Sequence, residues 1–294
     1  MKINILFPQD PFGKNKVDSV YDGEFNACKL MNIKSYYYDY DELVNEDVFL
    51  SDIDDRANGV LIYRGWMLKP EQYKKLYDNI IEKTNGYLSL INSPEQYTNC
   101  HCFPYIYDDI KRFTPKIVVF DKWDYPSEIY DGKELIDFDF FLKDYVKSTK
   151  TDKGIERIPK NTNIYNLFNK MKSFIEERSS LFTIGVVAKE FVDLKKINNY
   201  TNEWRAFYLF GDLIDLTNNS EVDTSNGDKP LDSLVVELGD ILSSKSNFFT
   251  VDFALTEDNK WIVIETGDGC VSGLSPHCND LVFYNKIANY DYFK

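Results

Sequence analysis

Two acidic residues interrupt a pair of apolar segments near the C-terminus, and this feature constrains the fold most. The first segment (247–255) contains FFTVDFAL, and the second (260–266) reads KWIVIET. Runs rich in β-branched and aromatic residues predict buried or half-buried strands, where a lone carboxylate is costly unless it is paired or binds a metal. Asp252 and Glu265 therefore predict a shared hard cation such as Mg²⁺, which also holds substrate phosphates. We expect a chain that handles a phosphorylated nucleotide.

The composition narrows the class of protein. The chain has 294 residues, enough for two domains, and a net charge of −14, which argues against binding to a nucleic-acid backbone. No run reaches the roughly 18–20 apolar residues of a membrane span, and the start of the sequence lacks the apolar segment of a signal peptide. Five cysteines do not suggest a disulfide framework. We expect a soluble, cytoplasmic protein without a membrane partner.

Strands and helices alternate over residues 1–113, which predicts an α/β lobe with a largely parallel sheet. The expected strands are residues 2–7, 33–38, 59–63 and 86–91. The expected helices are residues 18–31, 69–83 and a short one that starts at Pro94.

Residues 114–294 change character and predict an α+β region. The expected strands are residues 116–120, 138–145, 183–192, 202–210, 212–217 and the C-terminal pair, and the expected helices are 162–178 and 229–243. Tight turns such as Phe210-Gly211-Asp212 favour an antiparallel sheet. Lysine and threonine residues are frequent in 146–154, which predicts a loop.

Two segments are candidates for nucleotide contacts. Lys143 leaves an aromatic strand for the predicted loop, and Lys147 follows four residues later. Such lysines reach phosphates as point charges, although a solvated strand end is the alternative. In GVVAKEFVDL (185–194), Glu190 is placed to accept from ribose hydroxyls, while the backbone from Lys189 to Val192, which includes Phe191, can meet an adenine edge. A merely exposed glutamate is the alternative.

Two arginines are candidates for binding anions. Arg205 lies between aromatic residues in a strand, where its planar guanidinium suits a γ-phosphate or an acyl phosphate. An ion pair with Glu203 or Asp252 is the alternative. Arg64 ends a strand of the first lobe, where ligands gather in parallel sheets, so it can grip a substrate carboxylate. A surface arginine is the alternative there.

The remaining candidates lie in a glycine-rich turn and around the histidines. The turn IETGDGCVSGL (264–274) contains Asp268, Ser272 and Gly273, and its three glycines permit close approach of a ligand. His101 and His277 are the two histidines, and His101 is a candidate substrate contact or proton carrier. Zinc on the neighbouring cysteines is the alternative, but the C-x-C spacing is unusual for it.

Taken in order, these residues resemble the ATP-grasp superfamily. The pieces FPQDPF, YRGW and LINSPEQYTNCH resemble one branch of it, the clade named for two arginines and a lysine, many of whose members are proposed peptide or amide ligases. The resemblance implies a pre-ATP-grasp α/β lobe over 1–113 and an ATP-grasp nucleotide-binding region with an antiparallel sheet over 114–294. It implies the following site residues: Lys143 on the phosphates, Glu190 with Phe191 and Val192 on the adenosine, Arg205, and Mg²⁺ on Asp252 and Glu265.

The sequence departs from the family pattern in two places. The usual E-x-N ending of the late strand is Glu265-Thr266-Gly267 here, so we expect Asp268 to replace the missing asparagine as a metal ligand. The phosphate-covering loop, glycine-rich in many relatives, contains only Gly154, and Ser148 and Thr149 take over its hydrogen bonding in this interpretation.

The resemblance implies an ATP-dependent carboxylate–amine ligase that uses ATP and Mg²⁺. A small-molecule or peptide carboxylate would form an acyl phosphate, which an amine donor then converts to an amide with release of ADP and phosphate. The expected substrate contacts are Arg64, His101, Ser272 and Gly273. The missing asparagine favours a rival, an ATP-binding module that acts as a sensor or accessory subunit. A second rival is an ATP-grasp kinase or nucleic-acid end-modifying enzyme, and the negative charge argues against its nucleic-acid version.

Overall fold

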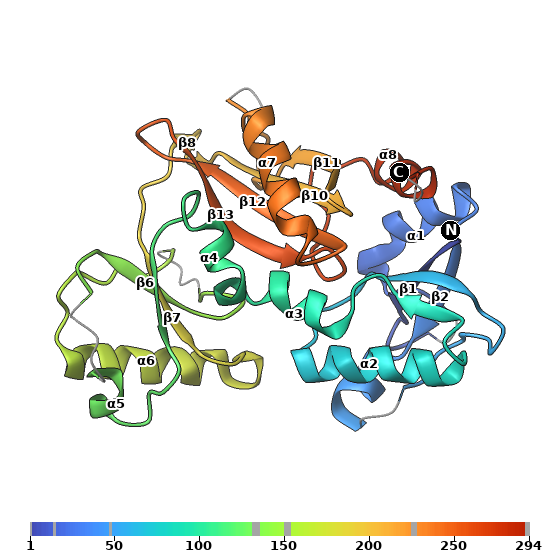
Figure 1. Ribbon diagram of the computed structural model, residues 1–294, viewed down its shortest axis with the longest axis horizontal. Helices are drawn as coiled ribbons and strands as arrows, with labels where there is room; N and C mark the ends of the chain where they lie inside the picture. The colour runs from blue at the N-terminus through green and yellow to red at the C-terminus, as the bar shows by residue number, and fades with distance from the viewer. Residues whose placement is uncertain are drawn as a thin grey trace.

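The computed structural model describes residues 2–13, 16–46, 49–130, 136–149, 154–224 and 228–291. Within these residues the strands form two four-stranded sheets, a three-stranded sheet and a two-stranded hairpin. The three larger sheets lie in a row along the longest axis, with the C-terminal four-stranded sheet in the middle (Figure 1). Of the predicted loop 146–154, residues 150–153 lie outside the described residues.

The N-terminal lobe contains a parallel sheet in the order β2-β1-β3-β4, as the alternation of strands and helices predicts. Its strands are β1 (Ile3–Pro8), β2 (Lys34–Tyr38), β3 (Gly59–Tyr63) and β4 (Leu88–Leu90). Its helical segments are η1 (Ser19–Tyr21), α1 (Asp22–Leu30), η2 (Glu42–Glu46), α2 (Pro70–Lys83) and α3 (Pro94–His101). The predicted start of α3 is confirmed, since the Ser93 side chain and Gln96 form a reciprocal capping box before it.

The C-terminal region contains two antiparallel sheets, as predicted. The middle sheet, in the order β11-β10-β12-β13, consists of β10 (Glu203–Leu209), β11 (Asp212–Asn218), β12 (Phe248–Leu255) and β13 (Trp261–Asp268). The outer sheet, in the order β5-β7-β6, consists of β5 (Ile117–Phe120), β6 (Phe140–Asp144) and β7 (Val186–Glu190). The hairpin strands are β8 (Lys196–Ile197) and β9 (Tyr200–Thr201).

Helices cover one face of each antiparallel sheet. The helical segments that follow α3 in the chain are η3 (Phe103–Tyr105), α4 (Tyr107–Ile110), α5 (Pro126–Tyr130), α6 (Ile164–Arg178), η4 (Ser179–Leu181), α7 (Asp232–Ser243) and α8 (Asp280–Ala288). The long helix α6 packs on the outer sheet, where Met171 joins the apolar core of β6 and β7 (Figure 1). Leu238 of α7 packs in the same way on the middle sheet. In both cases an apolar helix stripe covers one sheet face. The other face of the middle sheet packs in part on the N-terminal lobe through Phe207 and Phe248, so only the rest of that face can carry a site.

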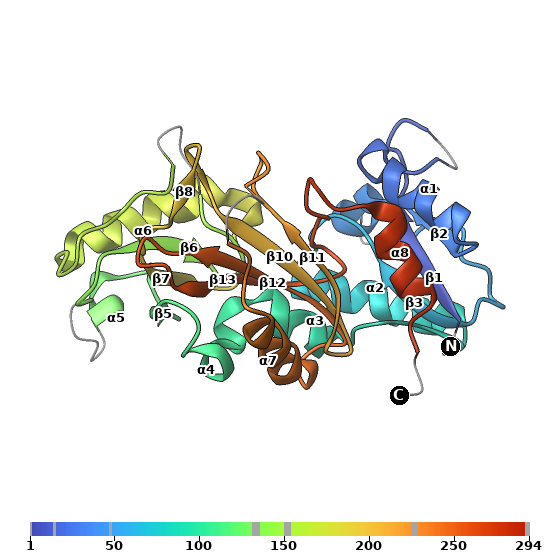
Figure 2. The ribbon, with the colours of Figure 1, turned by 90° about the horizontal axis from the view of Figure 1, so that it is seen from above.

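The two predicted regions interlock in space. Helix α8, which the sequence analysis did not anticipate, returns to pack on α1 of the N-terminal lobe (Figures 1 and 2). Its residues Phe283 and Ile287 belong to the core of that lobe. Conversely, Phe103 and Ile106 belong to the core of the middle sheet. A boundary at residues 113/114 therefore remains a proposal, and the packing crosses it in both directions.

In the described part of the chain, no helix is both long enough and apolar enough to span a membrane.

Candidate active site

Three charged side chains lie side by side across the middle sheet. Arg205 on β10 is the register partner of Asp252 on β12, and Asp252 is in turn the register partner of Glu265 on β13. Residues directly opposite one another on neighbouring strands point to the same face of the sheet. The strand register therefore brings together Arg205 and the two carboxylates that the sequence singles out.

Arg205 and Asp252 form a bidentate ion pair. Arg205 Nε donates to Asp252 Oδ1 at 2.7 Å, and Arg205 Nη2 donates to Asp252 Oδ2 at 2.6 Å. A third bond runs from Arg205 Nη1 to the carbonyl of Gly273 at 2.9 Å. The ion pair with Asp252, one of the two alternatives for this arginine, is thus present, while Glu203 bonds Thr201 instead. The pair also raises the pKa of Arg205, although burial opposes the charge.

Three lysines reach the same face from β6, β7 and the loop after β6. Lys147 Nζ lies 2.9 Å from Glu265 Oε2, and Lys143 Nζ lies 3.5 Å from Glu265 Oε1. Lys189 Nζ donates to the carbonyl of Ile264 at 2.6 Å. The side chains of Lys143 and Lys189 are buried and lie over the ring of Phe103. The outer sheet thus points its lysines at the carboxylate of the middle sheet.

This cluster holds more positive than negative charge. Lys143, Lys147, Lys189 and Arg205 face only two carboxylates, and the net charge of the whole chain is −14. Burial lowers the pKa of Lys143, and it lowers the pKa of Lys189 well below its usual range. Burial alone would raise the pKa of Glu265, but Lys147 and Lys143 hold it at about 2. A polyanion would compensate the cationic excess.

The expected adenosine segment lies at the end of β7. The Glu190 side chain accepts a hydrogen bond from the Lys116 N–H at 3.0 Å, so this carboxylate already has a partner within the protein. The Phe191 N–H donates to the carbonyl of Asp139. Among the described residues, the N–H of Val192 has no hydrogen-bond partner. Val192 is therefore the backbone donor of this segment that remains available to an adenine edge, and the adenosine contacts remain a proposal.

Arg64 lies neither at an open substrate site nor at the protein surface, which are the two environments that the sequence suggests. Its side chain is 1% exposed and forms a bidentate pair with Glu24, with distances of 2.8 and 3.0 Å. Its Nη1 also donates to the carbonyls of Gly269 and Ser272. Arg64 is thus no surface residue, and its donors hold the loop after β13 rather than an open substrate site. We therefore withdraw it as a direct substrate contact.

Asp268 lies away from Asp252 and Glu265. Because side chains alternate along a strand, its offset of three residues from Glu265 places it on the opposite face of β13. There it is fully buried, and it accepts hydrogen bonds from the Asn92 side chain and from the Cys270 N–H at 2.8 Å. Burial raises its pKa to about 7 although these bonds oppose the shift. The structure contradicts the prediction that Asp268 replaces the asparagine of E-x-N.

Asn92 connects this residue to the middle sheet. Its side chain donates to Asp268 and to the carbonyl of Phe248, and its Oδ1 accepts from the N–H groups of Asn247 and Phe248, both at 3.0 Å. All of these partners lie more than 150 residues away in the chain. A single amide therefore joins β4 to the start of β12 and the end of β13.

The other predicted substrate residues lie around the same loop. Ser272 Oγ bonds Thr250 Oγ1 at 2.9 Å, and the Gly273 carbonyl accepts from Arg205. His101 is buried on α3, where burial and Lys147 lower its pKa to about 3, so its ring is neutral. Across the described ranges no three His, Cys, Asp or Glu residues are placed to hold a metal, which leaves the zinc alternative without a site.

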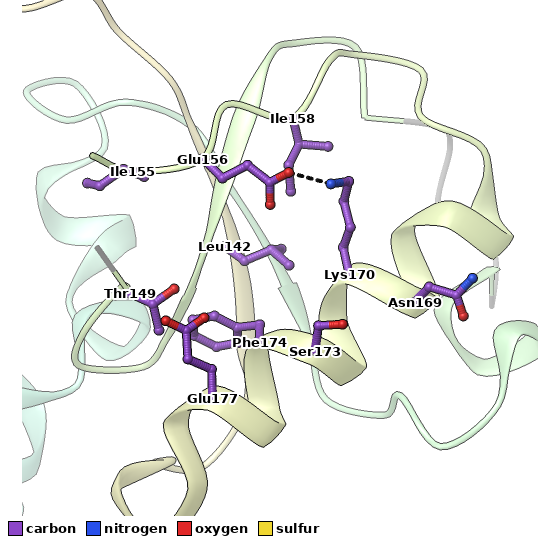
Figure 3. A pocket seen from close by; sticks show the side chains of 10 residues that line it. All are labelled: Leu142, Thr149, Ile155, Glu156, Ile158, Asn169, Lys170, Ser173, Phe174 and Glu177. Atoms are coloured by element: carbon purple, nitrogen blue, oxygen red, sulfur yellow. Dashed lines mark hydrogen bonds and ion pairs between the residues drawn. The ribbon is translucent and has the colours of Figure 1, made fainter. Parts of the chain in front are cut away.

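Two cavities flank the cluster. One, of about 660 Å³, lies between η1, the residues after β3 and the loop after β13, and Lys147 and Gly273 are part of its lining. The other, of about 270 Å³, lies between β6 and α6 and contains the ion pair of Glu156 with Lys170 (Figure 3). Leu142 lines the second cavity, while its neighbour Lys143 points to the opposite face of the sheet. Only the first cavity is continuous with the charged cluster.

One protein family matches the part of the chain that contains these charged residues. The model of the ATP-grasp domain, R2K clade family 3, matches residues 130–287, which is just over half of the chain. The chain belongs to this ATP-grasp family. The resemblance noted from the sequence is thereby confirmed, and the match includes Lys143, Arg205, Asp252 and Glu265.

Solved structures share the fold of this ATP-grasp protein over nearly its whole length. D-cycloserine synthetase has 13% identity and a TM-score of 0.61, with 97% of this chain and 98% of that chain covered. D-alanyl-alanine synthetase A from Vibrio cholerae has 10% identity and a TM-score of 0.55, with 97% and 93% covered. A macrocyclase from Microcystis aeruginosa, bound with a precursor peptide, has 11% identity and a TM-score of 0.56, with 99% of both chains covered. These likenesses confirm the ATP-grasp fold.

No curated protein matches the chain by sequence.

The donor set of this ATP-grasp site fits Mg²⁺. Asp252 and Glu265 supply carboxylate oxygens from adjacent strands, and hard divalent cations prefer such ligands. Because no third side chain of this kind joins them within the described ranges, phosphate oxygens and water would complete the shell. Lys143, Lys147 and Arg205, which pair with these two carboxylates in the structure, would then face the phosphates.

Proposed function

We propose that this chain is an ATP-dependent carboxylate–amine ligase, which forms an amide or peptide bond through an acyl phosphate. The observation that carries the proposal is the excess of cations around Asp252 and Glu265 in a strongly acidic protein. Such an excess suits a nucleoside triphosphate and a transferring phosphoryl group. The names of the similar structures, two synthetases and a macrocyclase, support the same class of reaction.

In the first step, an oxygen of the substrate carboxylate attacks the γ-phosphorus of ATP. The bond between that phosphorus and the β–γ bridging oxygen breaks, and ADP leaves with the electron pair. Lys143, Lys147 and Arg205 stabilise the charge on the phosphoryl oxygens, and this stabilisation is electrostatic because the groups are already in position. Asp252 and Glu265 would hold Mg²⁺, whose contribution is to neutralise charge on the phosphates.

In the second step, the nitrogen of the amine attacks the acyl carbon. The carbon–nitrogen bond forms and the bond between the acyl carbon and the phosphate oxygen breaks. The departing phosphate takes the electron pair of that bond and accepts the proton that the nitrogen loses. We place the acyl phosphate near Arg205 and Gly273, because the Arg205 guanidinium and the Gly273 carbonyl meet at the edge of the large cavity. Ser272 shapes this loop through Thr250, and we assign it to the substrate side.

The buried lysines are suited to contacts with a polyanion. Lys189, which the sequence suggested only as a backbone contact, also turns its ammonium group toward the cluster. Burial disfavours the charged forms of Lys143 and Lys189 in the absence of an anion. A bound triphosphate would reverse that effect, since an opposite charge nearby favours the charged form.

One observation favours a second function, an ATP-binding module without turnover. The E-x-N asparagine is absent, and Asp268 points away from the site, so two carboxylates remain where the family pattern offers a third ligand. A module of this kind would bind ATP but would not release ADP.

The decisive experiment measures nucleotide binding and turnover on one preparation. Saturating ATP with Mg²⁺ is expected to raise the melting temperature by mass action. Incubation with ATP, Mg²⁺ and pooled carboxylates and amines is expected to release ADP only when both substrates are present, and mass spectrometry should find a new amide. An unchanged melting temperature would refute the nucleotide site, whereas binding without any amide or ADP release would favour the module.

A further inference from the structure

The large cavity beside the charged cluster contains polar groups that the mechanism above leaves unused. It measures about 660 Å³, and residues from both ends of the chain line it. Lys147 and Gly273 form part of its wall and connect it to the phosphate side. Val20, Trp66 and Leu274 contribute apolar wall.

Ser275 in this wall has an unsatisfied hydroxyl. The residue is 4% exposed, and its Oγ has no hydrogen-bond partner in the described structure. A buried hydroxyl without a partner costs free energy, and native proteins rarely retain one unless a ligand or water completes it. Because Ser275 lines the cavity, a group that binds in the cavity can supply the missing bond.

Asp280 is the second unused group. Its half-buried carboxylate has no ion pair or hydrogen bond among the described residues. The other charged lining groups are already paired: Glu24 with Arg64, and Lys147 with Glu265. The charge of Arg64 acts on Asp280, but no cation is in contact with Asp280 among the described residues. Asp280 gives the cavity a negative group in the same wall as an unsatisfied hydroxyl, and the two groups together favour an ammonium group over a carboxylate.

Gly23 makes room for this carboxylate. A Cβ at position 23 would lie 2.3 Å from Asp280 Oδ2, so any larger residue would have to displace the Asp280 side chain. The position of the carboxylate thus depends on a glycine from the other end of the chain. A substitution at Gly23 can therefore displace the Asp280 carboxylate without removing its negative charge.

We propose that this cavity binds the amine donor, and that the donor is a primary amine with an apolar substituent. Asp280 and Ser275 would hold its ammonium group, while the wall around Val20 and Trp66 would cover the substituent. Before the attack, the ammonium would pass one proton to the Asp280 carboxylate, which leaves a neutral amine with a free electron pair. The assignment as a donor rests on the proposed ligase function. The binding of an apolar ammonium does not depend on it. Burial and Glu24 raise the pKa of Asp280 although the charge of Arg64 opposes the shift, which agrees with a carboxylate that has no cation in direct contact.

The test is calorimetric titration of the full chain with L-leucinamide, whose free amine carries an apolar side chain. N-acetyl-L-leucinamide, which lacks the ammonium, and N-acetyl-L-leucine, which is a carboxylate, are the comparison probes. We expect saturable binding of leucinamide alone. Asp280→Asn should weaken it about 10- to 100-fold, the range for a lost hydrogen bond to a charged group, and Ser275→Ala should weaken it by a smaller factor.

Two further variants separate binding from folding. Asp232 is also the first residue of a helix, α7, and it is exposed, so Asp232→Asn controls for the loss of a carboxylate at a helix N-terminus and should leave binding unchanged. Gly23→Ala keeps every charge and adds a residue that favours helix, but it displaces the Asp280 carboxylate and should weaken binding.

The outcomes are distinguishable from those of the ligase proposal. Equal binding of leucinamide and its acetylated form, preference for the carboxylate probe, no saturable binding, or full affinity in Asp280→Asn and Gly23→Ala would each overturn the amine site. A melting temperature that does not respond to ATP would instead overturn the nucleotide site and leave the leucinamide result to be judged by itself.

Discussion

Replacing Glu265 with glutamine is the most informative single change. The substitution keeps the shape of the side chain but removes the negative charge that Lys143 and Lys147 share. In the unliganded protein, one fully buried and one partly buried ammonium group would then lie side by side without their ion-pair partner, and only the charges of Asp144 and Asp252 would still act on them. Such a loss is more costly than the loss of a surface pair, because each cation has already given up its hydration.

The lowered pKa of Glu265 gives the size of the expected loss of folding free energy. The lysines hold it at about 2 against an ordinary value of 4.5. At neutral pH this difference corresponds to about 3 kcal/mol of folding free energy, at about 1.36 kcal/mol for each tenfold change. The side chain is 24% exposed, so solvent screening is limited. For a chain of 294 residues the loss corresponds to a melting temperature lower by about 5 °C.

The lowered pKa of Glu265 also determines how its contribution to stability changes with pH. Glu265 stabilises the fold above its unfolded pKa, and this contribution is lost as the pH falls from about 4.5 towards about 2. The difference in melting temperature between the wild type and Glu265→Gln should therefore be largest near neutral pH and shrink as acid is added. ATP without Mg²⁺ should stabilise the variant more than the wild type, because its phosphates can replace the missing carboxylate.

The assay is a set of thermal melts from pH 7 down to about pH 2.5, with and without ATP, so that it covers most of the range in which the contribution of Glu265 is lost. Glu237→Gln is the matched control, since Glu237 pairs with Arg112 at the surface and such pairs contribute about 0–1 kcal/mol. A Glu265→Gln protein that melts within about 2 °C of the wild type, or that gains nothing from ATP, would refute the electrostatic account of the cluster.

Two more predictions follow from the site. Arg205→Lys should lower turnover on the order of 10²–10³-fold, the range for one lost charge-stabilising donor, and weaken nucleotide binding far less; normal ADP release with a lower melting temperature would show a purely structural pair with Asp252. Burial raises the folded-state pKa of Asp268 to about 7, so its contribution to stability is present below its unfolded pKa and is lost as the pH rises towards 7. Melts from pH 5 to pH 8 should show this decline in the wild type, and Asp268→Asn should flatten it.

The part of the site that the sequence predicted is local in the chain. Asp252 and Glu265 lie on strands joined by a short turn, so their register is set by nearby residues and the pattern alone placed them together. Arg205 lies opposite Asp252 but 47 residues away in the chain, and its aromatic neighbours and the family resemblance, not a local pairing, made it a candidate. The division into a parallel N-terminal sheet and antiparallel C-terminal sheets was predictable, since periodicity and turn residues are local signals.

The errors concern contacts between distant segments. Nothing near Arg64 in the sequence shows that Glu24 and the carbonyls of Gly269 and Ser272 would surround it. The error at Asp268 was avoidable, because the alternation of a strand already separates it from Glu265. Helix α8 also left a signal: Asn279 accepts from the Val282 N–H, and apolar residues follow at helical spacing.

The interlocked ends of the chain define which piece can be exchanged between relatives. A chimaera that imports residues 1–113 alone would bring foreign groups against the native β13 turn and α8, where Arg64 and Asn92 now satisfy buried carbonyls and a buried carboxylate. Each mismatch would leave a buried polar group unsatisfied. The transplantable module is therefore discontinuous and comprises the N-terminal lobe together with residues 268–288. Recombination experiments that change substrate choice in this protein will have to move both ends of the chain at once.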